Sequence, residues 1–166
     1  MKKIFLLFAV FAIVTVQKSF AQESAKQNQF SSILNSYYSI KNALVSSDAS
    51  SAAVSAKEFL TALDGLDMKT MSDSDHKAFM ALQEKLSKDA KTIENSKNIE
   101  TQRTAFSSLS DNVYSLAKDV KLSSDPIYQQ YCPMKKSSWL SNEAAIKNPY
   151  YGKSMPTCGK VTNTLK

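Results

Sequence analysis

The sequence predicts an all-α domain: an up-and-down four-helix bundle with an irregular C-terminal tail packed on it. Two observations lead to this prediction. All four prolines, both cysteines and two of the three glycines lie after residue 122, and Gly65 is the only glycine or proline before that point. In the earlier part, apolar residues recur at three- and four-residue steps, the spacing of one face of an α-helix. Long helices followed by an irregular segment account for both patterns.

Four apolar series define the helices in chain order. The first series is Phe30, Ile33, Leu34, Tyr37, Ile40 and Leu44. The second is Ala52, Ala56, Phe59, Leu60 and Leu63. The third is His76, Phe79, Leu82, Leu86, Ala90 and Ile93. The fourth is Phe106, Leu109, Val113, Leu116 and Val120. Asp48, Asp73 and Asn98 precede the later series, and short acceptors there cap the free amides of a first turn. Connections of a few residues make successive helices antiparallel neighbours.

The first 21 residues have the three parts of a bacterial secretory signal. Lys2 and Lys3 supply the positive end, the run over 4–16 is apolar, and small residues precede a cleavage site before Gln22. The apolar run is shorter than the roughly 20 residues that a membrane span needs, and no second such stretch follows. We therefore expect export to the periplasm, cleavage of the signal, and no membrane span afterwards.

The charge and the length of the chain limit the classes of partner and the number of domains that we expect. The chain has 21 Lys and Arg against 15 Asp and Glu, and the signal holds three of the lysines, so the mature chain carries +3. This mild, interspersed charge does not indicate a nucleic-acid partner. We expect a linker over 22–29, the bundle over 30–122, and the tail over 123–166 in the same domain.

The tail carries the residues with the most distinctive chemistry. Cys132 and Met134 flank a proline, and Met155 precedes Cys158 by three positions. Thiolate and thioether sulfurs are soft donors that suit copper(I) better than hard cations. Prolines restrict the backbone nearby, and Gly152 and Gly159 permit turns that fold the second pair toward the first. The tail therefore predicts a soft-metal site, with copper(I) as the favoured ion.

Other interpretations of these residues stay open at this point. Two cysteines in an exported protein are also typical of a disulfide, which would make the chain a structural or partner-binding module. Met134 and Met155 could instead fill gaps in a core. Zinc is disfavoured, because two cysteines and one distant histidine fall short of its usual four ligands.

Some residues outside this sulfur set also have two interpretations. His76, the single histidine, is either a buried core residue or a weaker candidate metal ligand. Trp139 is expected to anchor the tail on the bundle or, alternatively, to lie beside a copper(I) ion. The tail tyrosines are expected to share this anchoring or to line a ligand groove: Tyr128, Tyr131, Tyr150 and Tyr151. Arg103 is expected to form an ion pair, with an anion site as the alternative. No metalloprotease pairing, phosphate loop or nucleophile elbow is present, so we expect no enzymatic activity.

Several short motifs of the sequence resemble those of a known family. In the tail they are Tyr131-Cys-Pro-Met, Trp139-Leu-Ser, Asn148-Pro-Tyr-Tyr-Gly and Met155-x-x-Cys-Gly. In the body, the stretches that begin at Tyr37 and at Gln102 are similar to its first and last helices. The family is the domain of unknown function 3347, whose members resemble exported proteins. The same domain is also found attached to periplasmic adaptor subunits of heavy-metal efflux pumps. The resemblance implies a role in handling copper or heavy metals, with Cys132, Met134, Met155 and Cys158 as ligands and such an adaptor as a partner.

Overall fold

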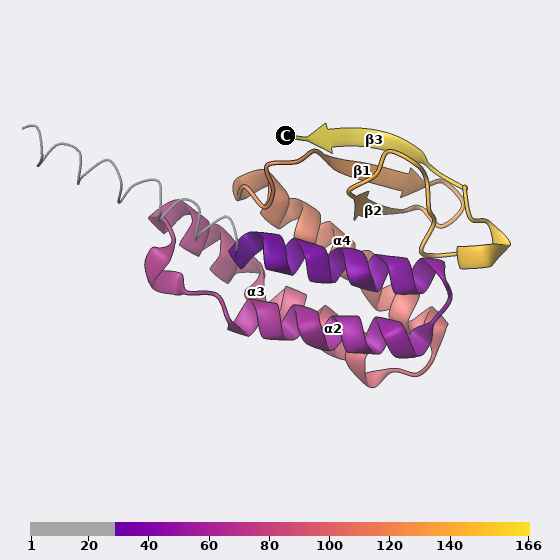
Figure 1. The fold of residues 1–166 in the computed structure, drawn as a ribbon, viewed down its shortest axis with the longest axis horizontal. Helices are drawn as coiled ribbons and strands as arrows, with labels where there is room; N and C mark the ends of the chain where they lie inside the picture. The colour runs from indigo at the N-terminus through magenta and orange to yellow at the C-terminus, as the bar shows by residue number, and fades with distance from the viewer. Residues whose placement is uncertain (1–28) are drawn as a thin grey trace, which may run out of the picture.

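The computed structural model describes residues 29–166, which form four helices followed by a three-stranded sheet (Figure 1). The first helix covers residues 29–45. The others are α2 (Ala49–Asp64), α3 (Asp73–Asn95) and α4 (Ile99–Asp119), with a 3-10 turn, η1 (Met68–Thr70), between α2 and α3. The strands are β1 (Ile127–Cys132), β2 (Ser137–Ser141) and β3 (Lys160–Leu165), and a second 3-10 turn, η2 (Gly152–Ser154), precedes β3.

α2, α3 and α4 begin at side-chain caps. The Asp48 carboxylate accepts a hydrogen bond from the Ser51 amide at 2.9 Å, and Asn98 Oδ1 accepts from two amides of the first turn of α4. Both predicted caps are confirmed. The third is wrong by one residue, because Ser72 caps α3 by accepting from the Asp75 amide at 3.2 Å, and Asp73 is already helical.

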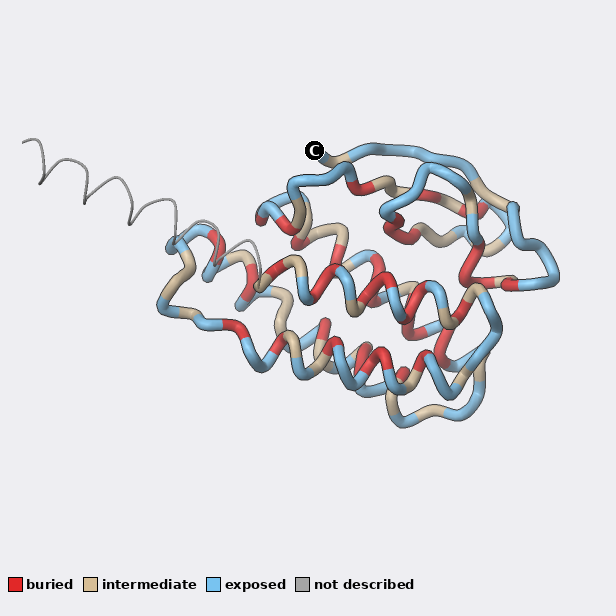
Figure 2. The backbone as a smooth tube through the Cα atoms, viewed as in Figure 1, coloured by how far each residue is buried: buried red, intermediate tan, exposed pale blue. Residues whose placement is uncertain are grey.

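The four apolar series form the core of a helical bundle, as predicted. Every residue of the first series is buried, and so are most members of the other three (Figure 2). Leu60 and Leu82 are partly buried against that core, and His76 is exposed. α3 packs between α2 and α4, and α4 also packs against β2. The core therefore extends from the bundle to one face of the sheet.

The tail is not irregular, so the all-α prediction is wrong for this part of the chain. β1 lies in the centre of an antiparallel sheet with the order β2-β1-β3, and a bulge interrupts the β1–β3 pairing between Gln129 and Gln130. The strands were difficult to recognise because β1 buries the polar Gln130 together with Ile127 and Cys132, which obscures the alternation of polar and apolar residues. Pro133 lies in the hairpin turn, where the lack of an amide proton does not disturb the sheet.

The signal peptide predicted over 1–21 lies outside the described residues. So does the linker predicted over 22–29, except for residue 29. No helix in the described part of the chain is long and apolar enough to cross a membrane.

Candidate metal centre

The sheet brings the two cysteines together at one end of the molecule. Cys132 is the last residue of β1, and Cys158 lies in the segment that leads into β3, which pairs with β1 (Figure 1). Their sulfurs are 3.4 Å apart, and both are free thiols. Cys132 is fully buried and Cys158 is partly buried. Residues 26 positions apart in sequence therefore form one dithiol.

The segment that carries Cys158 is held by Asn148. The backbone amide of Asn148 donates to the carbonyl of Pro156 at 2.9 Å, and its side-chain amide donates to the carbonyl of Cys158 at 2.6 Å. Its side-chain oxygen accepts from the amides of Tyr150 and Tyr151. A single buried side chain thus fixes the Asn-Pro-Tyr-Tyr-Gly segment and sets the position of Cys158.

Gly159 allows this segment to approach the sheet closely. Its φ is +154°, and a Cβ there would lie 2.9 Å from the Trp139 ring and 3.1 Å from the Tyr131 carbonyl. A larger residue would therefore push the adjacent Cys158 away from Cys132. Trp139 is fully buried and makes an edge contact with the buried ring of Tyr150. The Tyr150 ring also contacts the Phe106 ring of α4, so Tyr150 anchors the tail on the bundle, as predicted.

The hairpin turn after Cys132 directs backbone amides toward its sulfur. The Lys136 amide donates to the Cys132 carbonyl at 2.8 Å, and the Lys135 amide donates to Cys132 Sγ at 3.5 Å. Burial acts to raise the pKa of the Cys132 thiol, but hydrogen bonds from the Lys135 amide, Cys158, Asn148 and the Met134 amide outweigh it and lower that pKa. The hydrogen bond to Cys132, with partial burial, raises the pKa of Cys158. Cys132 is therefore the thiol that ionises first.

The two candidate thioethers are exposed residues close in sequence to the cysteines. Met134 is in the hairpin turn and is 64% exposed, and Met155 is 37% exposed. The carbonyl of Met155 accepts a hydrogen bond from the Cys158 amide at 3.3 Å, so Met155 lies in the same tight turn as this cysteine. Neither methionine fills the core. Both side chains are available to ligands, whereas the thiols are mostly buried.

His76 does not join this site. It is exposed in the first turn of α3, and α3 begins at the end of the bundle opposite to that at which β1 ends (Figure 1). His76 was predicted to be either a buried core residue or a ligand that meets the tail. Its exposed position agrees with neither prediction. In the described residues, no three His, Cys, Asp or Glu side chains come together in a group that could hold a metal ion. The candidate donor set is therefore two thiols and two thioethers.

Arg103 attaches the tail to the bundle. It forms the predicted ion pair with Glu100 at 2.6 Å, and it also donates to the carbonyl of Pro149 at 3.0 Å and to Ser47 Oγ at 3.0 Å. Gly152 lies directly against this group with φ +51°, and a Cβ there would be 2.7 Å from Arg103 Nη2. The cluster joins the end of the first helix, α4 and the segment that positions Cys158.

Sequence reasoning missed Lys41, which is 1% exposed between the first helix and the sheet. Its ammonium donates to Ser141 Oγ at 3.3 Å and lies 5.8 Å from the centre of the Tyr38 ring, and no carboxylate of residues 29–166 lies within ion-pair distance. Burial lowers its pKa to about 8, although the charge of Glu143 opposes this change. Its place between Ile40 and Leu44 in the first apolar series was the available signal, but lysine in a core is rare.

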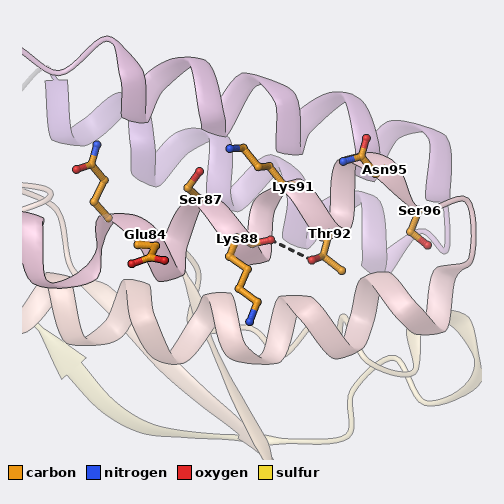
Figure 3. Close-up of a pocket in the computed structure, with 8 residues that line it drawn as sticks. Glu84, Ser87, Lys88, Lys91, Thr92, Asn95 and Ser96 are labelled. Carbon is orange, nitrogen blue, oxygen red and sulfur yellow. Dashed lines mark hydrogen bonds between the residues drawn. The ribbon is translucent and has the colours of Figure 1, made fainter.

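An open hollow lies elsewhere, along α3 (Figure 3). It has a volume of about 880 Å³ and is wide open to solvent. Its lining comes from one helix and includes Glu84, Lys88, Lys91 and Thr92. These side chains lie along an exposed face and do not converge on a point, so this surface lacks the concave arrangement of a ligand site.

Comparison with known proteins identifies the family. The family described as Protein of unknown function (DUF3347) matches residues 33–125, which cover the bundle from the first helix to the start of the sheet. No curated protein and no solved structure matches the chain. The sheet and the segment that holds Cys158 lie after the matched region. The chain belongs to the family of proteins of unknown function DUF3347.

Proposed function

We propose that this protein binds a soft metal ion, with copper(I) as the favoured ion, through Cys132 and Cys158. The observation that carries the proposal is the 3.4 Å separation of two free sulfurs at the end of a sheet. The exposed Met134 and Met155 supply further sulfur donors. The protein is not proposed to be an enzyme, since no catalytic constellation accompanies the thiols.

The donor set fits such an ion. Two sulfurs that each bond one ion at about 2.3 Å can lie at most about 4.6 Å apart, so the observed separation lies within reach of a bridging ion. Thiolate and thioether donors select soft ions such as copper(I). Zinc would need two further ligands of its usual kind, and the described residues place no histidine or carboxylate beside this pair. Copper(I) is satisfied by fewer, softer ligands.

The compartment and partners are part of the same proposal. The predicted secretory signal supports a protein exported to the periplasm, where copper traffic occurs outside the reducing cytoplasm. The resemblance that links this family to adaptor subunits of heavy-metal efflux pumps supports such an adaptor as a partner. The ion would then be carried to, or withheld from, that pump.

A second candidate function rests on the same dithiol. If the sulfurs approach from 3.4 Å to the roughly 2.05 Å of a disulfide, Cys132 and Cys158 join β1 to the segment before β3. Closing this loop would contribute about 3 kcal/mol in the chain-entropy model. The chain would then be a structural or partner-binding module. The number of free thiols in apo protein purified from the periplasm without reductant separates the two functions, because none is free in the disulfide form and both are free in a metal site stripped of its ion.

Anaerobic competition with a chromophoric copper(I) chelator tests the proposal. Reduced protein is expected to bind one copper(I). The variant Cys132→Ser should lose more than the roughly 100-fold in affinity that removal of an outer-shell partner costs. The double variant Met134→Leu, Met155→Leu should lose about tenfold, or about 1.4 kcal/mol. Met80→Leu is the matched control, since Met80 is 50% exposed on α3, and it should bind as the unmodified protein does. Equal affinity in Cys132→Ser overturns the proposal.

A further inference from the structure

The two halves of the protein differ sharply in charge. Residues 29–125 hold eleven Lys and Arg against thirteen Asp and Glu, a net charge of −2. Residues 126–166 hold six lysines against the single acid Glu143, a net charge of +5. Glu143 is itself paired with Lys147 at 2.5 Å. The sheet half therefore presents uncompensated positive charge next to the bundle, whose charge is slightly negative.

Four of these lysines lie in or next to the two segments that carry the cysteines, the β1–β2 hairpin and the segment from η2 to β3. Lys135 and Lys136 are in the turn after Cys132, Lys153 is in η2, and Lys160 follows Cys158 by two residues and pairs with Tyr131. The end of β1, η2 and the start of β3 lie at the same end of the molecule (Figure 1). Lys136, Lys153 and Lys160 are exposed, and none of the four forms an ion pair within residues 29–166. We call these four residues the lysine rim.

A lysine rim is an unexpected neighbour for a site that takes up a cation. It raises the local potential, so it repels a free metal ion and lowers the rate at which the ion arrives. The same potential attracts an anion, and clusters of one sign of charge raise association rates by about 10- to 1000-fold. It also stabilises the loaded site, because two thiolates and one copper(I) carry a net negative charge.

From the rim and the dithiol together we propose that copper(I) reaches this site from a small anionic complex that the lysine rim attracts. The inference rests on the proposed function. The incoming species is copper(I) held by anionic soft ligands such as thiolates. Copper(I) keeps its oxidation state during the exchange: each protein thiol loses a proton to solvent as its sulfur binds the ion, and the donor ligands leave as free anions. Met134 and Met155 are exposed, whereas Cys132 is buried, so solvent reaches these thioethers more readily than it reaches the Cys132 thiol.

Stopped-flow transfer from two donors of opposite charge tests this route. The anionic donor is the bis(bicinchoninate) complex of copper(I), and the cationic donor is its bis(neocuproine) complex. Transfer from the anionic donor is expected to slow as sodium chloride is raised, because salt screens the attraction. Transfer from the cationic donor is expected to be slower at low salt and to accelerate as salt is added.

A charge-matched pair of variants locates the effect. Replacement of Lys135, Lys136, Lys153 and Lys160 by Gln should slow transfer from the anionic donor by about tenfold at low salt. Replacement of the exposed Lys85, Lys88, Lys91 and Lys97 by Gln removes the same charge on and beside α3 and should change this rate less than twofold. Circular dichroism and Trp139 fluorescence verify that both variants are folded.

The outcomes distinguish this inference from the function on which it rests. If the unmodified protein fails to compete for copper(I) at equilibrium, the proposed function is wrong. If it binds copper(I) but both donors transfer at equal, salt-independent rates, the inference alone is overturned. An equal loss of rate in both charge variants also overturns it, because the net charge of the chain, and not the rim, would then control the approach.

Discussion

The helical half and the sheet half of this protein are held together by different means. The bundle over 29–122 is stabilised by apolar stripes that bury almost all of their members. The sheet half over 126–165 buries fewer apolar side chains for its length. Buried polar anchors position it: Asn148 fixes the Cys158 segment, and Arg103 ties that segment to α4. Apolar packing therefore stabilises the helical bundle, whereas a few specific hydrogen bonds position the dithiol.

The two halves nevertheless share one interface. The Tyr37 hydroxyl accepts a hydrogen bond from the Leu140 amide of β2 at 2.9 Å, and it also contacts Ser110 Oγ on α4 at 2.8 Å. The Phe106 ring lies between those of Tyr37 and Tyr150. Because this core is continuous, we expect the halves to unfold together.

The largest expected effect on stability is that of Gly152→Ala. A non-glycine residue at φ +51° costs roughly 1–2 kcal/mol, and the new methyl would displace Arg103 and Ser47 from their hydrogen bonds. We expect the free energy of unfolding to fall by about 3 kcal/mol or more in urea denaturation. Gly65→Ala is the control, since Gly65 ends α2 with an ordinary φ of −81°, and it should change stability by less than about 1 kcal/mol.

The same denaturation experiment tests the comparison of the two halves. Trp139, the single tryptophan, reports on the sheet, and far-ultraviolet circular dichroism reports on the helices. We expect both signals to change at the same urea concentration. If fluorescence changes at clearly lower urea than the dichroism, the sheet half unfolds independently and the continuous core does not couple them.

A smaller effect is expected at Lys41, on the boundary between the halves. Its pKa in the folded protein is lowered to about 8 from the ordinary value of 10.5, so folding favours the neutral amine. The penalty for burying its charge is fully present below pH 8 and disappears as the pH rises toward 10.5. The unmodified protein should therefore gain about 2 kcal/mol of stability between pH 7 and 9.5 from this group.

The variant Lys41→Met should lack this gain. It should be more stable than the unmodified protein at pH 7, and the difference should shrink as the pH rises. Lys57→Met, at an exposed position of α2, is the control and should keep the pH dependence. A pH profile of Lys41→Met parallel to that of the unmodified protein would show that Lys41 is not the titrating group.

The sequence allowed most of the bundle and only part of the site to be predicted. Helices were recognisable because their apolar spacing and caps are local features, as at Asp48 and Asn98. The sheet was missed because its signals are not local: β3 is exposed along almost its whole length, and β1 buries Gln130, whose side-chain amide donates to carbonyls of the 143–145 turn. Lys41 was missed because its place between Ile40 and Leu44 is only a weak signal, and lysine is rare in a core.

The pairing of the cysteines was a hypothesis that the sequence could not decide. Spacing alone favours neither a disulfide nor a metal site, and the approach of Cys158 to Cys132 depends on Asn148 and Gly159, which act through the fold. The structure brings the two thiols together and leaves Met134 and Met155 exposed, and it separates His76 from the thiols.

The most direct test of the central claim is X-ray absorption at the copper edge, recorded on reduced protein loaded with one equivalent of copper(I). We expect a first shell made only of sulfur, including two short copper–thiolate distances. The double variant Cys132→Ser, Cys158→Ser should lose this shell or fail to retain copper. A first shell of nitrogen or oxygen in the unmodified protein, or an unchanged sulfur shell in the double variant, would contradict the claim that this dithiol is the metal site.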